Sequence, residues 1–157
     1  MVRTGIGFDA HAFDAGRPLV LGGVTIPGHA GLAGHSDADV LSHAVADALL
    51  GAAALGDLGA RFPDDDRWRG ASSLDILRAT AALVGGAGYA IVNVDGSIVA
   101  EAPRLAPHAA AMRANVAAAL GIAEGAVSVK ATTTDRLGFI GRGEGIAALA
   151  VATIEAR

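Results

Sequence analysis

Strand-like and helix-like segments alternate along the chain, and this order limits the folds open to it. Short β-branched or alternating apolar runs predict strands, and apolar residues at helical spacing predict helices. The predicted strands are residues 4–8, 19–21 and 24–26 (a hairpin around Gly22-Gly23), 89–100, 127–133 and 146–154. The predicted helices run from Ser36 or Asp37 to about residue 55, from about 73 to 83, and from about 107 to 121. This order predicts an α/β sandwich, a mixed β-sheet with helices packed on one face.

The three segments between these elements are predicted to be loops: residues 28–34, 56–70 and 137–145. The second helix is expected to begin at Ser72, since residues 72–75 resemble a capping box, and Pro107 suits the first turn of the third. No repeat or linker interrupts the pattern. We therefore expect a single domain over residues 1–157.

The chain is unusually apolar for its size. Hydrophobic residues make up 52% of it and charged residues only 18%. A domain of 157 residues leaves much of its surface exposed. We therefore expect part of that surface to be covered by other copies of the chain. The alternative is a general bias toward Ala, which raises the apolar fraction without an interface.

Composition also excludes several classes of protein. The chain has no Cys, which rules out disulfides and thiolate zinc sites. Its 12 Lys and Arg form no basic stripe and its net charge is −4, which argues against a nucleic-acid partner. The uncharged stretch 79–94 is too short and too rich in Gly to span a membrane, and no signal peptide is visible. We expect a cytoplasmic protein.

Asp9, His11 and His43 form a candidate metal site. Residues i and i+2 of a strand point to the same side, so Asp9 and His11 would converge where the first strand ends. His43 lies in the first predicted helix and would supply a third ligand. Two imidazoles and one carboxylate can hold zinc and leave a position open for substrate. A chance D-x-H sequence is the alternative.

Asp39 and Asp47 lie one helical turn before and after His43, on the same predicted face. They would either support the metal ligand from outside or belong to a solvated polar stripe. The spacing alone leaves both interpretations open.

Residues 130–135 (KATTTD) end a predicted strand with three hydroxyls and a carboxylate. Such a strand end suits phosphate oxygens, and Asp135 would bind Mg²⁺ together with phosphate. An ordinary Thr-rich strand end is the alternative. The chain has neither a G-x-S-x-G motif nor a Cys nucleophile, so acyl-enzyme chemistry has little support.

Taken together, the motifs resemble those of the 2-C-methyl-D-erythritol 2,4-cyclodiphosphate synthase family, over nearly the whole chain. The matching segments are residues 7–13 (GFDAHAF), 35–40 (HSDADV), 47–52 (DALLGA), 56–59 (GDLG), 62–64 (FPD), 93–95 (NVD), 102–108 (APRLAPH), 130–134 (KATTT) and 137–145 (LGFIGRGEG). The resemblance implies a homotrimer with active sites between adjacent subunits. It also implies a lyase of the non-mevalonate isoprenoid pathway. In that reaction the 2-phosphate of 4-diphosphocytidyl-2-C-methyl-D-erythritol 2-phosphate attacks its own β-phosphate, and CMP leaves.

The resemblance also implies residue roles. Asp9, His11 and His43 match zinc ligands, and His35 and Thr133 match positions that stabilise the transition state. Asp135 matches the Mg²⁺ (or Mn²⁺) ligand, where the family usually has Glu. The positions that match substrate contacts are Asp9, His11, His35, Ser36, Asp57, Gly59, Phe62, Asp64, Asp66, Ala100, Pro103, Arg104, Leu105, Ala106, Ala131, Thr132, Thr133, Thr134, Asp135, Phe139 and Arg142.

Two other functions use the same residues. A zinc-dependent phosphoester hydrolase would attack with metal-activated water. A non-catalytic trimer would only bind a metabolite or isoprenoid phosphate. A cyclic product, a linear product or no product separates the three.

Overall fold

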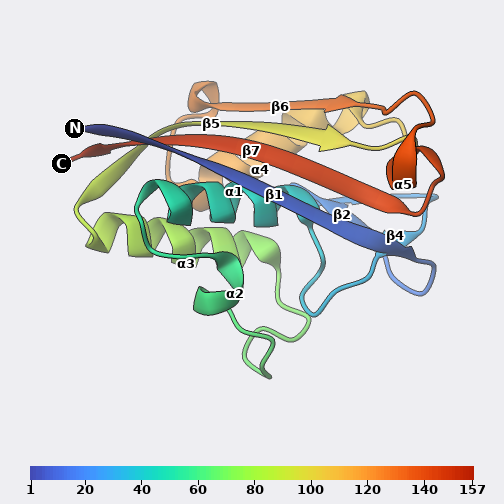
Figure 1. The fold of residues 1–157 in the computed structure, drawn as a ribbon, viewed down its shortest axis with the longest axis horizontal. Coiled ribbons are helices and arrows are strands. Elements are labelled where there is room, and N and C mark those ends of the chain that lie inside the picture. Colours follow the sequence, from blue (N-terminus) through green and yellow to red (C-terminus); the bar gives the residue numbers. More distant parts are fainter.

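A computed structural model describes all 157 residues (Figure 1). The elements in chain order are β1 (Val2–Asp14), β2 (Leu19–Leu21), β3 (Val24–Ile26), β4 (Gly31–Leu32), α1 (Val40–Ala52), α2 (Leu58–Arg61), α3 (Ser73–Gly86), β5 (Tyr89–Val99), η1 (Ala106–His108), α4 (Ala109–Leu120), η2 (Glu124–Ala126), β6 (Val127–Thr132), α5 (Gly138–Gly141) and β7 (Gly145–Ala156).

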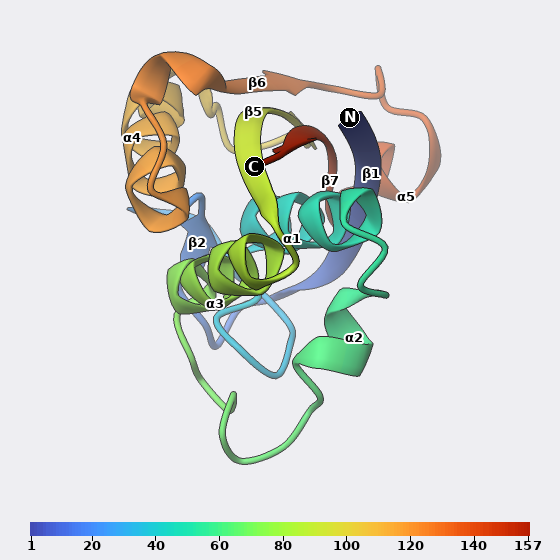
Figure 2. The same cartoon turned by 90° about the vertical axis from the view of Figure 1, so that its left-hand side faces the viewer.

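Five strands form one mixed sheet in the order β4-β1-β7-β5-β6. The β5–β6 pair is parallel and the other pairs are antiparallel. Helices α1, α3 and α4 lie on the same side of this sheet (Figure 2), while β2 and β3 form a separate hairpin. The predicted mixed sheet with helices on one face is confirmed. None of the helices has the length and apolar character needed to cross a membrane.

Small residues bring α1 very close to the middle of the sheet. A Cβ added to Gly5 of β1 would lie 2.0 Å from the carbonyl oxygen of Ala48, and one added to Gly7 would lie 1.9 Å from that of Ala44. Because only Gly permits such an approach, the helix lies directly on the strand. This contact places His43 of α1 over the strand that carries Asp9 and His11.

The first helix begins later than predicted. Asp39, not Ser36 or Asp37, is its N-cap, and its carboxylate accepts hydrogen bonds from the backbone N–H (3.1 Å) and the hydroxyl (2.8 Å) of Ser42. It also accepts from the N–H groups of Gly22 and Gly23, at 2.9 and 2.8 Å. The prediction was wrong because a carboxylate that serves both a hairpin turn and a helix start depends on tertiary contacts.

The three predicted loops each contain a short element. They hold β4, α2 and α5, of two, four and four residues. Runs this short carry no detectable periodicity, so the sequence pattern does not predict them. Whether they form a strand or a helix depends on their pairing and packing in the fold.

The sheet face without helices is apolar along β1 and β7. Ile6, Phe8, Leu149 and Val151 are 70%, 56%, 40% and 43% exposed there, and the pairing sets Ile6 opposite Val151 and Phe8 opposite Leu149. We call these four side chains the β1–β7 strip. Farther along the sheet the surface becomes polar, and Lys130 pairs with Asp95 at 2.5 Å.

Candidate active site

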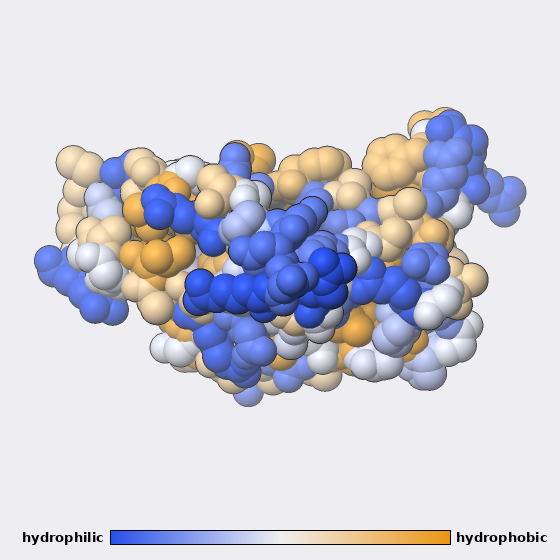
Figure 3. Space-filling view, turned by 90° about the horizontal axis from the view of Figure 1, so that it is seen from below, coloured by the Kyte–Doolittle hydropathy of each residue, from blue (hydrophilic) through white to orange (hydrophobic).

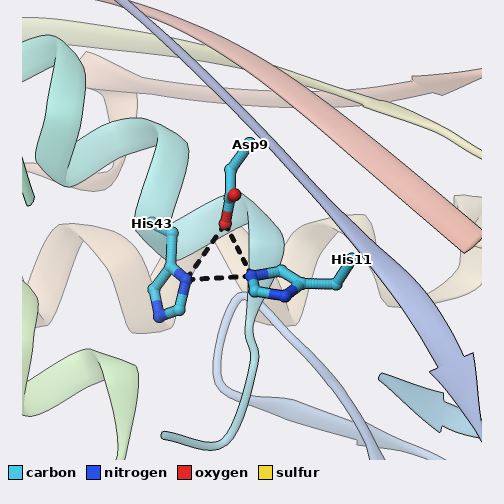
Figure 4. A group of neighbouring side chains, drawn as sticks. All are labelled: Asp9, His11 and His43. Carbon is cyan, nitrogen blue, oxygen red and sulfur yellow. Dashed lines mark hydrogen bonds and ion pairs between the residues drawn. The ribbon is translucent and has the colours of Figure 1, made fainter. Parts of the chain in front are cut away.

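Asp9, His11 and His43 meet as predicted from the strand and helix spacing (Figure 4). Asp9 Oδ2 lies 2.8 Å from His11 Nε2 and 3.0 Å from His43 Nδ1, and the two nitrogens are 3.3 Å apart. One ligand atom from each residue falls within 4.8 Å of the others. Two imidazole nitrogens and a carboxylate oxygen at this spacing fit a divalent metal ion.

The cluster carries a firmly ionised carboxylate. Burial opposes ionisation of Asp9, but hydrogen bonds from His11 and His43 outweigh it and hold the pKa of Asp9 well below its usual range. Burial likewise favours the neutral ring of His11, yet the hydrogen bond with Asp9 raises the pKa of His11 above its usual value. The negative charge therefore persists at neutral pH and favours a cation in the cluster.

The side chains that support His43 are serines and not the carboxylates considered from sequence. His43 Nε2 lies 2.9 Å from Ser73 Oγ and 3.1 Å from Ser36 Oγ. Asp39 caps the helix, and Asp47 accepts a hydrogen bond from Leu58 N–H at 2.7 Å, and neither carboxylate hydrogen-bonds to the ring. Sequence reasoning missed Ser73, which lies 30 positions from His43 and shares no local pattern with it.

A cavity of about 230 Å³ opens beside the cluster. It is lined by Asp9, His11, Gly34, His35, Ser36, His43, Leu58, Phe62, Asp64, Trp68 and Ile76. The α2–α3 segment below it is hydrophilic (Figure 3), and the main-chain oxygen of Asp65 lies 2.6 Å from His35 Nε2. Four predicted site residues, His35, Ser36, Phe62 and Asp64, therefore line the cavity beside Asp9, His11 and His43. We call this hollow the metal-side cavity.

Two further predicted residues lie on another side of the cluster. Asp57 and Gly59 line a hollow with Asp9 and His43, and Asp57 caps α2 by accepting from Ala60 N–H at 2.8 Å. Asp66 lies outside both hollows, where it pairs with Arg69 at 2.9 Å.

A second cavity of about 280 Å³ lies where β5 and β6 end. Its lining is Ala100, Glu101, Pro103, Arg104, Leu105, Ala106, Ala131, Thr132 and Thr133, and each of these except Glu101 is a substrate-contact position implied by the resemblance. We call it the strand-end cavity. It shares no residue with the metal-side cavity, so the two predicted transition-state residues, His35 and Thr133, line different hollows of one chain.

Glu101 organises the turn that follows β6, a role that the sequence did not suggest. Its Oε1 accepts hydrogen bonds from the N–H and hydroxyl of Thr134, at 2.9 and 3.0 Å, and from Arg136 N–H at 3.3 Å. The bond from Thr134 N–H is the main reason that the pKa of Glu101 falls below its usual value. Asp135 lies in this turn and accepts from the Thr133 hydroxyl at 3.3 Å.

The last two predicted residues lie near α5. Phe139 is 41% exposed, and Arg142 pairs with Glu144 at 3.1 Å. Neither lines the metal-side or the strand-end cavity.

The fold and the site define a class of protein: a small α/β enzyme with a candidate metal centre at the junction of a strand and a helix. The model of the YgbB family matches residues 2–155, and the chain belongs to this family. A relative from Salinibacter ruber is 59% identical over 155 residues, covering 98% of this chain and 99% of its own length. One from Marinobacter nauticus is 58% identical over 156 residues, covering 99% and 98%. Both are named 2-C-methyl-D-erythritol 2,4-cyclodiphosphate synthase, so the predicted family is confirmed.

Solved structures agree with this assignment. The bifunctional IspDF from Campylobacter jejuni superposes with a TM-score of 0.96 at 43% identity, over 100% of this chain. Only 43% of that longer protein is matched, so this chain spans less than half of its length. A CDP complex of IspF from Plasmodium falciparum superposes with a TM-score of 0.86 at 31% identity, over 99% of this chain and 97% of that one.

Proposed function

We propose that this chain converts 4-diphosphocytidyl-2-C-methyl-D-erythritol 2-phosphate into 2-C-methyl-D-erythritol 2,4-cyclodiphosphate and CMP. It is then a phosphorus–oxygen lyase of non-mevalonate isoprenoid biosynthesis. The structural observation that carries the proposal is the opening of the Asp9, His11 and His43 cluster onto a cavity whose lining includes His35, Ser36 and Asp64. The shared name of its close relatives supports the same reaction.

The reaction needs no nucleophile from the protein. An oxygen of the 2-phosphate bonds to the β-phosphorus, the bond from that phosphorus to the bridging oxygen breaks, and CMP leaves with the bridging oxygen. Both reacting groups are anionic, so much of the barrier is charge repulsion. Holding the two ends together contributes up to roughly 7–11 kcal/mol in the best cases.

Zinc is the metal proposed for Asp9, His11 and His43, since imidazole and carboxylate ligands suit it. Asp135 is proposed to hold Mg²⁺ or Mn²⁺ together with the substrate diphosphate. When bound, these cations supply positive charge that offsets the repulsion between the phosphates.

The two cavities are proposed to receive the two ends of the substrate. The metal-side cavity, with Asp57, Gly59 and Asp66 near it, would take the methylerythritol phosphate. The strand-end cavity would take the cytidine, and His35 and Thr133 would donate hydrogen bonds to phosphate oxygens in the transition state. Thr134, Phe139 and Arg142 are proposed as further contacts at or beyond the strand-end cavity.

A homotrimer would complete the site. Two observations support this: the cavities share no lining residue, and the β1–β7 strip leaves large apolar side chains exposed. We propose that the metal-side cavity of one copy faces the strand-end cavity of the next. The proposed enzyme is cytoplasmic, with one domain over residues 1–157 and no nucleic-acid or membrane partner.

The test is ³¹P NMR of the protein with this substrate, Zn²⁺ and Mg²⁺. Two coupled diphosphate signals from a cyclic product, with one CMP released per product, are expected. A linear product or inorganic phosphate would instead establish the hydrolase. A protein that binds metal and substrate without turnover would be the non-catalytic trimer.

A further inference from the structure

The side chain of Glu101 connects the ends of two neighbouring strands. Strands β5 and β6 are parallel, with Val99 opposite Thr132, so the chain leaves both of them at the same edge of the sheet. Glu101 follows β5 by two residues, and the segment 133–137 follows β6. Glu101 and Thr133 both line the strand-end cavity. A side chain at position 101 can therefore reach from the end of one strand to the turn that follows the other.

The turn after β6 has a backbone conformation that its residue types disfavour. Asp135 and Arg136 both lie in the left-handed region, with φ of +51° and +65°. The carbonyl oxygen of Thr134 accepts from Leu137 N–H at 3.1 Å, which closes a turn with positive φ at both central positions. Such turns favour Gly, Asn and Asp, because most other side chains are crowded there. Other residues keep this conformation only where the surrounding structure holds them in it.

Glu101 supplies a contact of this kind. Its Oε1 accepts from the backbone N–H of Thr134 at 2.9 Å and of Arg136 at 3.3 Å, one on each side of Asp135. The Thr134 hydroxyl lies 3.0 Å from the same oxygen and 2.6 Å from the Leu137 carbonyl oxygen, and its single hydrogen serves one of them at a time. The two backbone N–H groups are therefore the contacts that fix the turn. Backbone N–H groups that converge in a turn form a concavity that suits an anion.

The turn carries two residues with proposed functions. The N–H of Asp135 donates to the Thr133 hydroxyl at 3.1 Å, and that hydroxyl donates to Asp135 Oδ1 at 3.3 Å. The two side chains are thus linked to each other, and their place depends on the backbone of the turn. We propose that Glu101 is a positioning residue: by accepting the two N–H bonds it holds Thr133 and Asp135 beside the strand-end cavity. This inference rests on the proposed function of Thr133 and Asp135 in the cyclisation.

Variants at position 101 separate the place of the acceptor oxygen from its charge. Glu101→Ala removes the acceptor. Glu101→Gln keeps an acceptor oxygen at the same reach without the charge, whereas Glu101→Asp keeps the charge on a side chain that is one methylene shorter. Glu124→Ala is the matched control, because Glu124 is exposed, lies just before the other end of β6 and lines neither cavity.

Two readouts test the proposal. The first is kcat and KM from CMP release, with Zn²⁺ and Mg²⁺ present. The second is the amide ¹H chemical shifts of Thr134 and Arg136 in protein without substrate or metal. An N–H that donates to a carboxylate resonates at low field, so these shifts report the contact whether or not the protein turns over substrate.

In Glu101→Ala we expect kcat to fall about 10- to 100-fold, as when other groups that orient functional residues are lost, with a much smaller change in KM. Both amide signals should move upfield. Glu101→Asp should lose kcat in the same way, Glu101→Gln should recover most of it, and Glu124→Ala should match the native protein. The bond between Leu137 N–H and the Thr134 carbonyl oxygen does not involve Glu101, so the chain should still turn here.

A native kcat in Glu101→Ala, an effect confined to KM, or amide signals that do not move would overturn the inference and leave the proposed function standing. So would a loss in Glu101→Gln as large as that in Glu101→Ala. If the native protein forms no cyclic product, the proposed function fails, while the amide shifts still show whether Glu101 holds the turn. If Glu101→Ala does not fold, Glu101→Gln and Glu101→Asp carry the test: a higher kcat in Glu101→Gln is expected, and equal values would overturn the inference.

Discussion

Gly7 of β1 packs against Ala44 of α1 so closely that an added Cβ would lie 1.9 Å from the Ala44 carbonyl oxygen. Gly7 stands two residues before Asp9, and Ala44 follows His43 directly. The contact therefore sets the distance between the strand that carries two cluster residues and the helix that carries the third.

Gly7→Ala should push α1 away from β1. We expect a loss of about 1–3 kcal/mol in the free energy of unfolding, as for other overpacked cores, together with weaker Zn²⁺ binding. Urea denaturation and chelator competition measure the two effects. Gly51→Ala is the control, because its new Cβ would have only the Ile6 oxygen nearby, at 4.0 Å, and Ala is favoured over Gly in a helix by up to about 1 kcal/mol. Equal stability of Gly7→Ala and the native protein would refute the contact.

His43→Ala should lose far more activity than Ser36→Ala. Removing a metal ligand takes away charge stabilisation of several kcal/mol, so we expect at least about a 100-fold loss in turnover, or roughly 2.7 kcal/mol. Ser36→Ala leaves the three cluster residues in place and should lose about tenfold or less. CMP release under saturating substrate measures both. Similar small losses in the two variants would argue against the metal role of His43.

Asp135→Glu should lower the Mg²⁺ concentration that the enzyme needs for half-maximal activity. The Asp side chain is one methylene shorter than the Glu usual in the family, so we expect the native protein to need more Mg²⁺ for half-maximal activity. The Mg²⁺ concentration at half-maximal CMP release is the measurement, with Asp75→Glu on the exposed surface of α3 as control. An unchanged Mg²⁺ requirement in Asp135→Glu would show that the shorter side chain has no effect.

Mixed oligomers test whether the site lies between copies. His43→Ala damages the metal-side cavity and Thr133→Ala the strand-end cavity, so each pure variant should be nearly inactive. In trimers mixed at random from equal amounts of both, about a quarter of the sites would pair an intact cavity of each kind. Co-expression should therefore recover activity well above that of either variant. Recovery no greater than the average of the two pure variants would contradict a shared site.

Much of the fold follows from local pattern. The alternating segments predicted the mixed sheet, the capping sequence at Ser72 predicted the start of α3, and paired left-handed glycines formed the expected hairpin turn (φ +53° at Gly22 and +70° at Gly23). The start of α1 was not predictable, since Asp39 acts as its cap while also binding a hairpin 16 to 17 residues away.

The meeting of Asp9, His11 and His43 could be predicted from their spacing. Residues i and i+2 of a strand point to the same side, and His43 lies on the helix that follows. The contacts of the residues around this cluster could not be predicted in that way. Ser73 reaches His43 and Glu101 reaches the Thr134 turn across 30 and 33 positions, and such contacts depend on how helices and loops settle on the sheet. The spacing of Asp39 and Asp47 on the helix was misleading for the same reason, since each carboxylate turns to backbone N–H groups elsewhere.

The most direct test of the central claim is turnover in H₂¹⁸O followed by mass spectrometry of both products. If the substrate's own 2-phosphate is the nucleophile, neither CMP nor the cyclic diphosphate gains an ¹⁸O atom. Incorporation of one ¹⁸O into CMP or into an uncyclised 2,4-bisphosphate would show that water attacks, and would contradict the cyclisation account.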